Sequence, residues 1–378
     1  MSRLPLMLLL LHVYVGARLL PDLPFGTAGI VLGAAVLVLS ACLIPFGFRM
    51  RRARPAGRAK ALMWAGLIAL GAFSTLLVLT FARDVALLLA LAADALLPGE
   101  IPLRAIEQWS ALAVPIVTAL LTIVGFRNAR RVASVRTIEV PIAALPAPLH
   151  GFTIAQITDV HVGPTIDGNH VEAVVEAVNR LEADLVAITG DLVDGSVRQL
   201  AGHTAPLARL RARHGAYFVT GNHEYYSGAH AWIGELRRLG IRVLVNEHVV
   251  LAHDGASLLV AGVTDHSAHH FDPAHRSDPA AAIAGAPDDV GVRVLLAHQP
   301  RSAFAAAPAG FDLQLSGHTH GGQFLPWNLF VRLQQPFTAG LARLGRLWVY
   351  TSRGTGYWGP PKRLGAPSEI TFLRLVPE

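Results

Sequence analysis

The chain has 378 residues, which is long enough for two domains of ordinary size. Hydrophobic residues make up 52% of it and charged residues only 15%, a composition too apolar for an ordinary soluble protein. The first 130 residues carry 12 Lys and Arg against 5 Asp and Glu, so the net charge of +6 accompanies apolar segments and argues against nucleic acid as a partner.

Long apolar segments in the first 130 residues predict an all-α transmembrane region of about four spans. Each approaches the roughly 20 residues that a helix needs to cross a bilayer. The first could be a signal peptide, but the spans that follow favour a retained helix, although His12 and Arg18 interrupt it. The four segments are residues 4–20, 27–48, 61–82 and 109–126.

Basic residues are concentrated in two places, between the second and third apolar segments and after the fourth. This distribution predicts which side of the membrane each end of the chain faces. One basic loop lies at 49–60, and a second group follows the last span at Arg127, Arg130, Arg131 and Arg136. The positive-inside rule places both in the cytoplasm, so we expect a multi-pass membrane protein with a cytoplasmic C-terminal domain. Residues 85–97 are short for a span and are interpreted as an interfacial or re-entrant helix; if they cross, the domain faces outward.

From residue 131 the pattern becomes that of a soluble α/β protein, with a linker at 131–150 marked by prolines and a domain at 151–378. Residues 169–182 repeat Val and Leu on one helical face. Residues 264–290 are interpreted as an insertion or a loop on the substrate side. The expected strands are 152–157, 185–189, 216–220, 258–263, 292–297 and 312–315.

Polar side chains that can bind metals follow five of these apolar runs. Because loops beyond the carboxyl ends of strands build ligand sites, we expect these residues to meet at one edge of the sheet. Each alone could be a helix cap, a turn residue or a buried histidine. They are Asp159 and His161, Asp191 and Asp194, Asn222, His223 and Glu224, His298, and His318 and His320.

The composition limits the metal chemistry of such a site. The only cysteine, Cys42, lies in an apolar run, whereas 16 of the 17 histidines follow residue 130. Imidazole, carboxylate and amide ligands suit Mn, Fe or Zn. Two Asp, one Asn and four His are too many for one ion but suit two ions, which promote phosphoryl transfer. His318 and His320, two apart on an extended segment, would each serve one ion, and the glycines beside them permit close approach.

The ordered motifs D-x-H, G-D-x-x-D, G-N-H-E, a lone His and G-H-x-H resemble the calcineurin-like metallophosphoesterases. The resemblance covers about 150–375, and its tail, ending in SRGTGYWGPPKRLGAPSEITFLRL, is similar to a bacterial subgroup with N-terminal membrane segments. It implies a four-layer α-β-β-α sandwich and a hydrolase that acts on phosphoesters. Some relatives hydrolyse a UDP-diacylglucosamine lipid precursor.

Carried over by position, the resemblance implies two metal ions that share Asp191. The first would be held by Asp159, His161, Asp191 and His320. The second would be held by Asp191, Asn222, His298 and His318. His223 would assist the leaving oxygen, Asp194 would orient His223, and Asn222 would also meet the phosphoryl group.

The sequence leaves two questions open: the class of substrate and the role of the histidines in 264–290. The membrane region favours a lipid-linked phosphoester or diphosphate, with soluble cyclic nucleotides as one alternative and a non-catalytic membrane scaffold as another. The complete ligand set argues against the scaffold. We expect His266, His269, His270 and His275 to lie in a solvated loop, and Asp265, just past a strand, is a candidate for shaping the substrate side.

Overall fold

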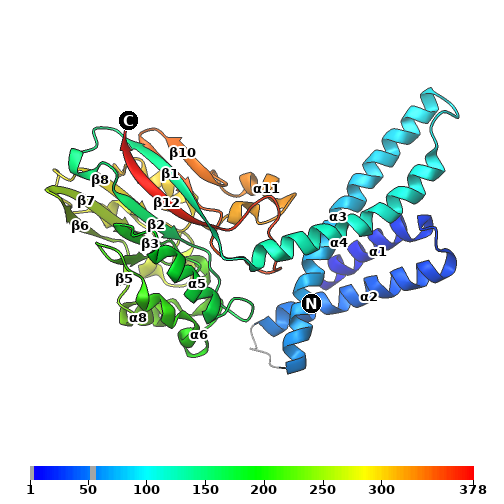
Figure 1. Cartoon of the computed structure of the whole chain (residues 1–378), viewed down its shortest axis with the longest axis horizontal. Helices are drawn as coiled ribbons and strands as arrows, with labels where there is room; N and C mark the ends of the chain where they lie inside the picture. The colour runs from blue at the N-terminus through cyan, green and yellow to red at the C-terminus, as the bar shows by residue number, and fades with distance from the viewer. Residues whose placement is uncertain (1–3, 52–56) are drawn as a thin grey trace. The chain divides into compact units, whose positions relative to one another are not determined.

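The computed structural model describes residues 4–51 and 57–378, and the chain divides into two compact units (Figure 1). The first unit comprises the chain up to Asn128 together with Gly359–Leu364, and the second comprises Ala129–Trp358 together with Gly365–Glu378. Arg52 and Arg54, which belong to the basic loop used above to orient the chain, lie outside the described residues.

Four long helices form most of the first unit. They are α1 (Leu4–Leu19), α2 (Gly26–Arg51), α3 (Gly57–Leu96) and α4 (Leu103–Arg130), with the short helix η1 (Leu20–Asp22) between the first two. Each long helix has a segment long and apolar enough to cross a membrane, which agrees in number with the expectation of about four spans.

Helix α3 corrects the interpretation of residues 85–97, which continue the preceding span instead of forming a separate helix. At 40 residues, α3 is about 60 Å long, roughly twice the hydrocarbon thickness. Arg83 and Asp84 do not end the helix because the bundle supplies partners. The guanidinium of Arg83 donates to Asp22 at 2.5 Å, and the carboxylate of Asp84 accepts from Tyr14 and Arg18. Residues 85–96 therefore belong to one continuous helix with the apolar segment before them.

A short segment from near the C-terminus also belongs to the first unit. The buried Lys362 ammonium donates to the carbonyl of Gly71 at 3.0 Å and to the hydroxyl of Thr75. The amide of Arg363 donates to the carbonyl of Gly125 at 2.9 Å. A Cβ on Gly125 would lie 2.6 Å from the Lys362 side chain, so this contact requires glycine. The sequence offered no signal that this segment leaves the C-terminal domain.

The second unit contains two six-stranded sheets. The first has the order β1 (Ser134–Ile142), β12 (Glu369–Pro377), β2 (Thr153–Ile157), β3 (Leu185–Ile188), β4 (Ala216–Phe218) and β5 (Arg242–Val243). The second has the order β10 (Gly340–Leu344), β11 (Leu347–Thr351), β9 (Leu313–Ser316), β8 (Val292–Leu296), β7 (Ala256–Gly262) and β6 (Glu247–His253).

The sheets pack face to face, and helices cover their outer faces, which confirms the four-layer α-β-β-α sandwich (Figure 1). Between the sheets lie fully buried side chains such as Ile154, Val260 and Tyr350. Each buried aliphatic side chain contributes about 1.5–3 kcal/mol to folding. The covering helices are α5 (Gly168–Asn179), α6 (Val197–Thr204) and α8 (Ala229–Arg238) on the first sheet, and α9 (Pro279–Ile283) and α10 (Ala303–Ala306) on the second.

The segment 131–150, expected to be a linker, contains strand β1. This strand pairs in parallel with β12 along its whole length, from Ser134 beside Glu369 to Ile142 beside Pro377. Pro141 is compatible with the strand because β1 lies at the sheet edge, where a missing N–H breaks no ladder. The pairing partner lies more than 200 residues away, so the local sequence carries no signal for it.

Candidate metal centre

The seven predicted metal ligands follow the carboxyl ends of five strands. Three of these strands, β2, β3 and β4, belong to the first sheet, and β8 and β9 belong to the second. The expectation of a single sheet edge is therefore wrong, because two packed sheets present their strand ends together. The chain order of the ligands is Asp159 and His161, Asp191, Asn222, His298, and His318 and His320.

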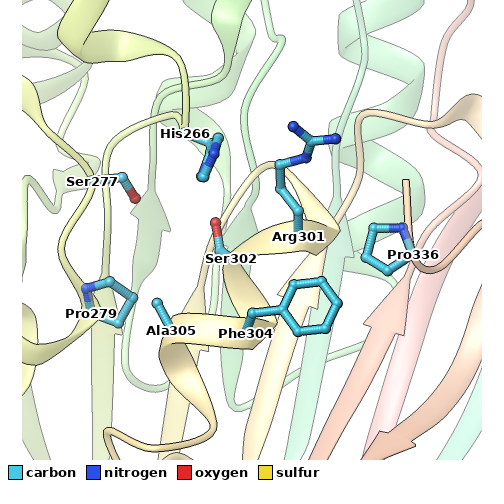
Figure 2. Close-up of a pocket in the computed structure, with 8 residues that line it drawn as sticks. All are labelled: His266, Ser277, Pro279, Arg301, Ser302, Phe304, Ala305 and Pro336. Carbon is cyan, nitrogen blue, oxygen red and sulfur yellow. The ribbon is translucent and has the colours of Figure 1, made fainter. Parts of the chain in front are cut away.

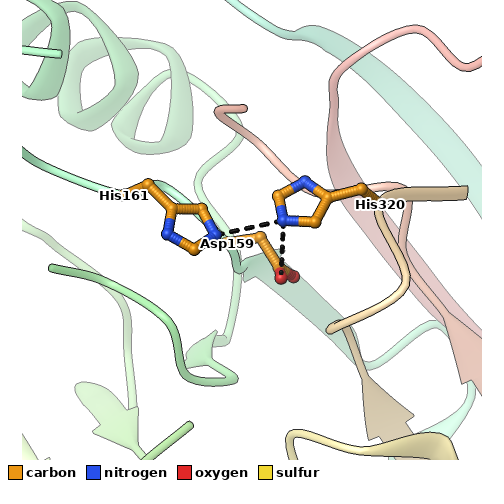
Figure 3. A group of neighbouring side chains, drawn as sticks. All are labelled: Asp159, His161 and His320. Carbon is orange, nitrogen blue, oxygen red and sulfur yellow. Dashed lines mark hydrogen bonds and ion pairs between the residues drawn. The ribbon is translucent and has the colours of Figure 1, made fainter. Parts of the chain in front are cut away.

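The first cluster consists of Asp159, His161 and His320 (Figure 3). Nε2 of His161 lies 3.0 Å from Nε2 of His320, which lies 3.4 Å from Oδ1 of Asp159. All three residues are buried. Two ring nitrogens and a carboxylate oxygen that converge at such distances offer lone pairs to a single cation.

The second cluster consists of Asp191, His298 and His318. Nε2 of His298 lies 3.2 Å from Oδ2 of Asp191 and 3.3 Å from Nδ1 of His318. The other ring nitrogen of His298 donates to the carbonyl of Thr189 at 2.8 Å, which leaves Nε2 free to bind a metal. Oδ2 of Asp191 also lies 3.9 Å from Nε2 of His161, so Asp191 stands between the two clusters.

The donor set fits divalent metal ions by two observations. Oδ1 of Asn222 is buried and accepts no hydrogen bond from the described residues, although buried amide oxygens normally have a partner. Imidazole pairs in both clusters face each other nitrogen to nitrogen. Nitrogen and oxygen ligands without thiolate suit Mn, Fe or Zn.

Backbone strain is concentrated at the ligands. Asp159, His161, Asp191, His318 and His320 all have positive φ, between 50° and 69°. The left-handed region costs a non-glycine residue about 1–2 kcal/mol and is tolerated where surrounding structure imposes it.

The same strain corrects the expectation that His318 and His320 lie on an extended segment. Strand β9 ends at Ser316, and the intervening Thr319 has helical angles. A left-handed turn thus carries His318 to the second cluster and His320 to the first.

Gly317 permits a close approach between the two sheets' loops. A Cβ at this position would lie 2.2 Å from Oδ2 of Asp159 and 2.2 Å from the hydroxyl of Thr158. In return, the amide of His318 donates to both carboxylate oxygens of Asp159, at 3.1 and 3.0 Å. The glycine therefore admits a ligand carboxylate to the backbone.

Burial and mutual charge set the protonation of the ligands. Burial raises the pKa of Asp159 to about 6, and burial together with His298 lowers the pKa of His318 to about 4. Burial also acts to raise the pKa of Asp191, but His298 and His223 outweigh it and hold this pKa well below its usual range. In the second cluster, an ionised Asp191 therefore lies beside a neutral His318. Burial acts to lower the pKa of His298, but Asp191 outweighs it and raises this pKa well above its usual value.

His223 lies beside the clusters and is oriented by Asp194. Oδ1 of Asp194 lies 2.5 Å from Nδ1 of His223 and 3.1 Å from Nδ1 of His161. Nε2 of His223 lies 4.0 Å from Oδ2 of Asp191. The rings of Tyr226 and Trp358 meet His223 edge-on at 5.2 and 5.8 Å. An imidazole held this way suits proton donation.

Glu224 positions the loop of Asp191, a role that the sequence did not reveal. Its fully buried carboxylate accepts from the amides of Gly221, Asp191 and Leu192 at 2.6, 2.9 and 2.8 Å. Burial raises its pKa to about 7. A glutamate three residues after Gly221 signals a helix cap, but its reach to the loop after β3 depends on the packing of β3 beside β4.

The segment 264–290 is more ordered than expected. His275 is buried, and its Nδ1 lies 2.8 Å from the Tyr225 hydroxyl, so the expectation of a solvated loop is wrong for this residue. Asp272 lies 2.9 Å from Nε2 of His230 and completes a cluster with His275. Asp265 is buried and accepts from Gln299 at 3.0 Å. His266 and His270 are exposed, and His269 is half-buried, as a surface loop requires.

A pocket of about 370 Å³ lies beside these loops (Figure 2). His266 follows Asp265, and Arg301 lies three residues after the ligand His298. In Figure 2 the guanidinium of Arg301 and the ring of His266 lie on one side of Ser302, and Phe304 lies on the other. The lining residues are His266, Ser277, Pro279, Arg301, Ser302, Phe304, Ala305 and Pro336.

Parts of this chain are similar in sequence to known proteins. Residues 152–322 match the calcineurin-like phosphoesterase family. An uncharacterised metallophosphoesterase of Campylobacter jejuni is 34% identical over 266 residues, covering 70% of this chain and 69% of that protein. A bovine (Bos taurus) transmembrane protein with metallophosphoesterase domain is 42% identical over 277 residues, covering 70% of this chain and 62% of that protein. The chain belongs to the calcineurin-like metallophosphoesterase family.

The matches to these proteins cover only part of each chain. This chain spans 62% of the bovine relative and 61% of a relative of the same name from Danio rerio. A solved 5'-nucleotidase precursor from Thermus thermophilus is similar at a TM-score of 0.40 and 16% identity, covering 60% of this chain and 54% of that one. With four helices able to cross a bilayer, the family domain of this chain is joined to a membrane region.

Proposed function

We propose that this protein is a membrane-anchored, dinuclear metal-dependent phosphoesterase that hydrolyses a phosphate ester or diphosphate of a lipid or a nucleotide-linked lipid. The observation that carries the proposal is the pair of clusters joined by Asp191, whose Oδ2 lies 3.2 Å from His298 and 3.9 Å from His161. The spacing between the clusters suits a shared carboxylate ligand.

The proposed ligand sets follow the two clusters. One metal would be held by Asp159, His161, Asp191 and His320, and the other by Asp191, Asn222, His298 and His318. When bound, such ions supply Lewis-acid charge for the phosphoryl oxygens and acidify water at neutral pH. The donor set is compatible with manganese, iron or zinc.

The chain's own residues would handle the leaving group. Asp194 holds Nδ1 of His223 at 2.5 Å, which leaves Nε2 to carry a proton toward the leaving oxygen. The side chain of His223 is 15% exposed, whereas that of His298 is fully buried, so His223 is the more accessible imidazole. The amide of Asn222 lies beside it and would meet a phosphoryl oxygen.

The membrane region supports a substrate that resides in or at the bilayer. A tethered enzyme is confined to a surface on which lipid phosphates are concentrated, whereas a soluble nucleotide gains nothing from the tether. The bovine relative, which shares the family domain, is itself named a transmembrane protein.

The catalytic test uses the full-length protein in detergent or nanodiscs with bis(p-nitrophenyl) phosphate and Mn²⁺. We expect two metal ions per chain and metal-dependent hydrolysis, both impaired in Asp191→Asn. A protein that binds no metal would refute the proposal. Lipid phosphodiesters in vesicles and cyclic nucleotides are then assayed side by side, and preference for the cyclic nucleotides would favour the soluble-substrate alternative. Two bound metals without turnover of any phosphoester would favour the scaffold.

We further propose that the catalytic domain faces the cytoplasm of a bacterial cell. Arg49, Arg58 and Lys60 at the facing ends of α2 and α3, and Arg127 and Arg130 near the end of α4, support this orientation. A single cysteine at exposed Glu176 in a Cys42→Ser background tests it. Labelling of intact cells by a membrane-impermeant maleimide would place the domain outside.

A further inference from the structure

A segment beyond the last metal ligand exposes five large apolar side chains to solvent. We call residues 325–333 the apolar flap. It includes α11 (Trp327–Phe330) and the short helix η8 (Val331–Leu333), neither of which has a buried residue. The exposed side chains are Leu325 (46%), Trp327 (42%), Leu329 (67%), Phe330 (52%) and Leu333 (81%).

The flap is fixed to the domain at both of its ends. Phe324 is only 7% exposed before it, and Gln335 is only 6% exposed after it. The amide of Gln335 donates to the side chain of Gln299 at 3.2 Å. Gly322 packs closely against Asn328, since a Cβ on Gly322 would lie 2.1 Å from the Cα of Asn328. The flap is thus a supported element whose apolar face points away from the domain core.

Elsewhere in the second unit, exposed large apolar residues either stand apart, such as Val250 on β6, or, like Tyr226 and Phe271, contact another ring. Five exposed large apolar side chains within nine residues are an unusual concentration for a soluble surface, and such concentrations mark interaction surfaces. The chemistry of the flap indicates the partner. Leu, Phe and Trp accompany Arg332, and residues 325–335 contain no acidic residue. This is the composition of segments that lie in the interface of an anionic bilayer.

The chain itself supplies the second argument for a bilayer. Four helices able to cross a membrane are covalently joined to the domain that carries the flap, so a lipid surface is always within reach. We propose that residues 325–333 insert their apolar side chains into the lipid interface of the membrane in which α1 to α4 reside.

The flap is also connected to the metal centre. It begins five residues after the ligand His320, and Gln299, which holds its far end, follows the ligand His298. Gln323, just before the flap, donates to the carbonyl of Trp358 at 2.9 Å, and the ring of Trp358 meets His223. Insertion would therefore bring the metal centre close to the lipid headgroups. This consequence rests on the proposed function, whereas insertion itself does not.

Insertion is measured on the full chain in liposomes that contain anionic lipid. A single cysteine at Leu329 in a Cys42→Ser background carries an environment-sensitive fluorophore, and lipids with spin labels at known depths serve as quenchers. We expect blue-shifted emission and quenching by shallow labels. The control is the same label at Val250, which is 42% exposed on β6 and should report water.

Two results would overturn the proposal. One is a Leu329 label that emits and is quenched like the Val250 label. The other is a blue shift without lipid quenching that disappears when the protein is diluted, which would assign the flap to contact with a second copy.

Measurements of turnover then distinguish the membrane contact of the flap from the identity of the substrate. The double variant Leu329→Asp, Phe330→Asp should lower the ratio of lipid turnover to bis(p-nitrophenyl) phosphate turnover by about tenfold. The reason is that weaker binding of the flap to the bilayer lowers the rate at which lipid substrate reaches the metal centre. Val250→Asp should leave the ratio unchanged. Insertion without any turnover of lipid would refute the lipid substrate and retain the membrane contact, whereas an unchanged ratio in the flap variant would refute delivery through the flap.

Discussion

Gly317→Ala should remove most of the activity while altering the chain by one methyl group. The added Cβ would lie 2.2 Å from Oδ2 of Asp159, whereas carbon and oxygen atoms rest at about 3.2 Å, so the carboxylate or the loop must move by about 1 Å. Thr158 presents the same clash on the other side, and both partners are fully buried, so neither can swing away.

The expected effect follows from the position of Asp159 in the first cluster. A displacement of about 1 Å in a ligand costs roughly 100-fold in rate, and overpacking costs about 1–3 kcal/mol of stability. We therefore expect fewer than two metal ions per chain by elemental analysis, about 100-fold lower kcat/KM on bis(p-nitrophenyl) phosphate, and a lower Tm.

The matched control is Gly202→Ala in α6, where an added Cβ would meet nothing within 4 Å. This variant should match the unaltered protein or be slightly more stable, because alanine favours helix over glycine. Full metal content and unaltered turnover in Gly317→Ala would refute the reasoning, since the clash would then be relieved without moving a ligand.

Three further results are expected. Asp194→Asn, assayed at saturating metal, should lower kcat by about 100-fold or more, since His223 loses the carboxylate that supports its proton transfer. Saturating metal is needed because Asp194 also contacts the ligand His161, and an unchanged kcat would remove Asp194 from the mechanism. Glu224→Gln should cost about 2–3 kcal/mol in denaturant unfolding because both carboxylate oxygens accept from backbone amides and glutamine replaces one of them with an NH2 donor. A stability equal to that of the unaltered protein would contradict the role of Glu224. Metal affinity, measured by competition with a chelator, should fall as the pH drops below about 6, because burial raises the pKa of Asp159 to about 6 and its protonated form competes with the metal; affinity independent of pH from 7 to 5 would exclude this coupling.

Much of the candidate site follows from local sequence. Each apolar run ends in a polar residue, and strands buried on both faces carry such residues to the strand ends, so Asp159, Asp191 and His298 could be assigned to one site without coordinates. The four apolar segments likewise predicted helices because length and hydropathy alone decide whether a segment can cross a bilayer.

Other features depend on contacts between distant residues. Glu224 could be expected to cap its helix, but only the packing of β3 beside β4 brings the loop of Asp191 to its carboxylate. The exposed flap at 325–333 contains an ordinary apolar pattern, and only the solvent exposure of its side chains distinguishes it from a core segment.

The sequence by itself determined which chemical groups are available and at which strand ends they stand, because residue type and short-range periodicity are local properties. Tertiary structure decided that β1 closes the sheet against β12, that Lys362 lies among the membrane helices, and that a left-handed turn sends His318 and His320 to different clusters. These outcomes depend on which surfaces are buried against each other. The burial free energy belongs to pairs of segments hundreds of residues apart, so the local sequence of either segment does not predict it.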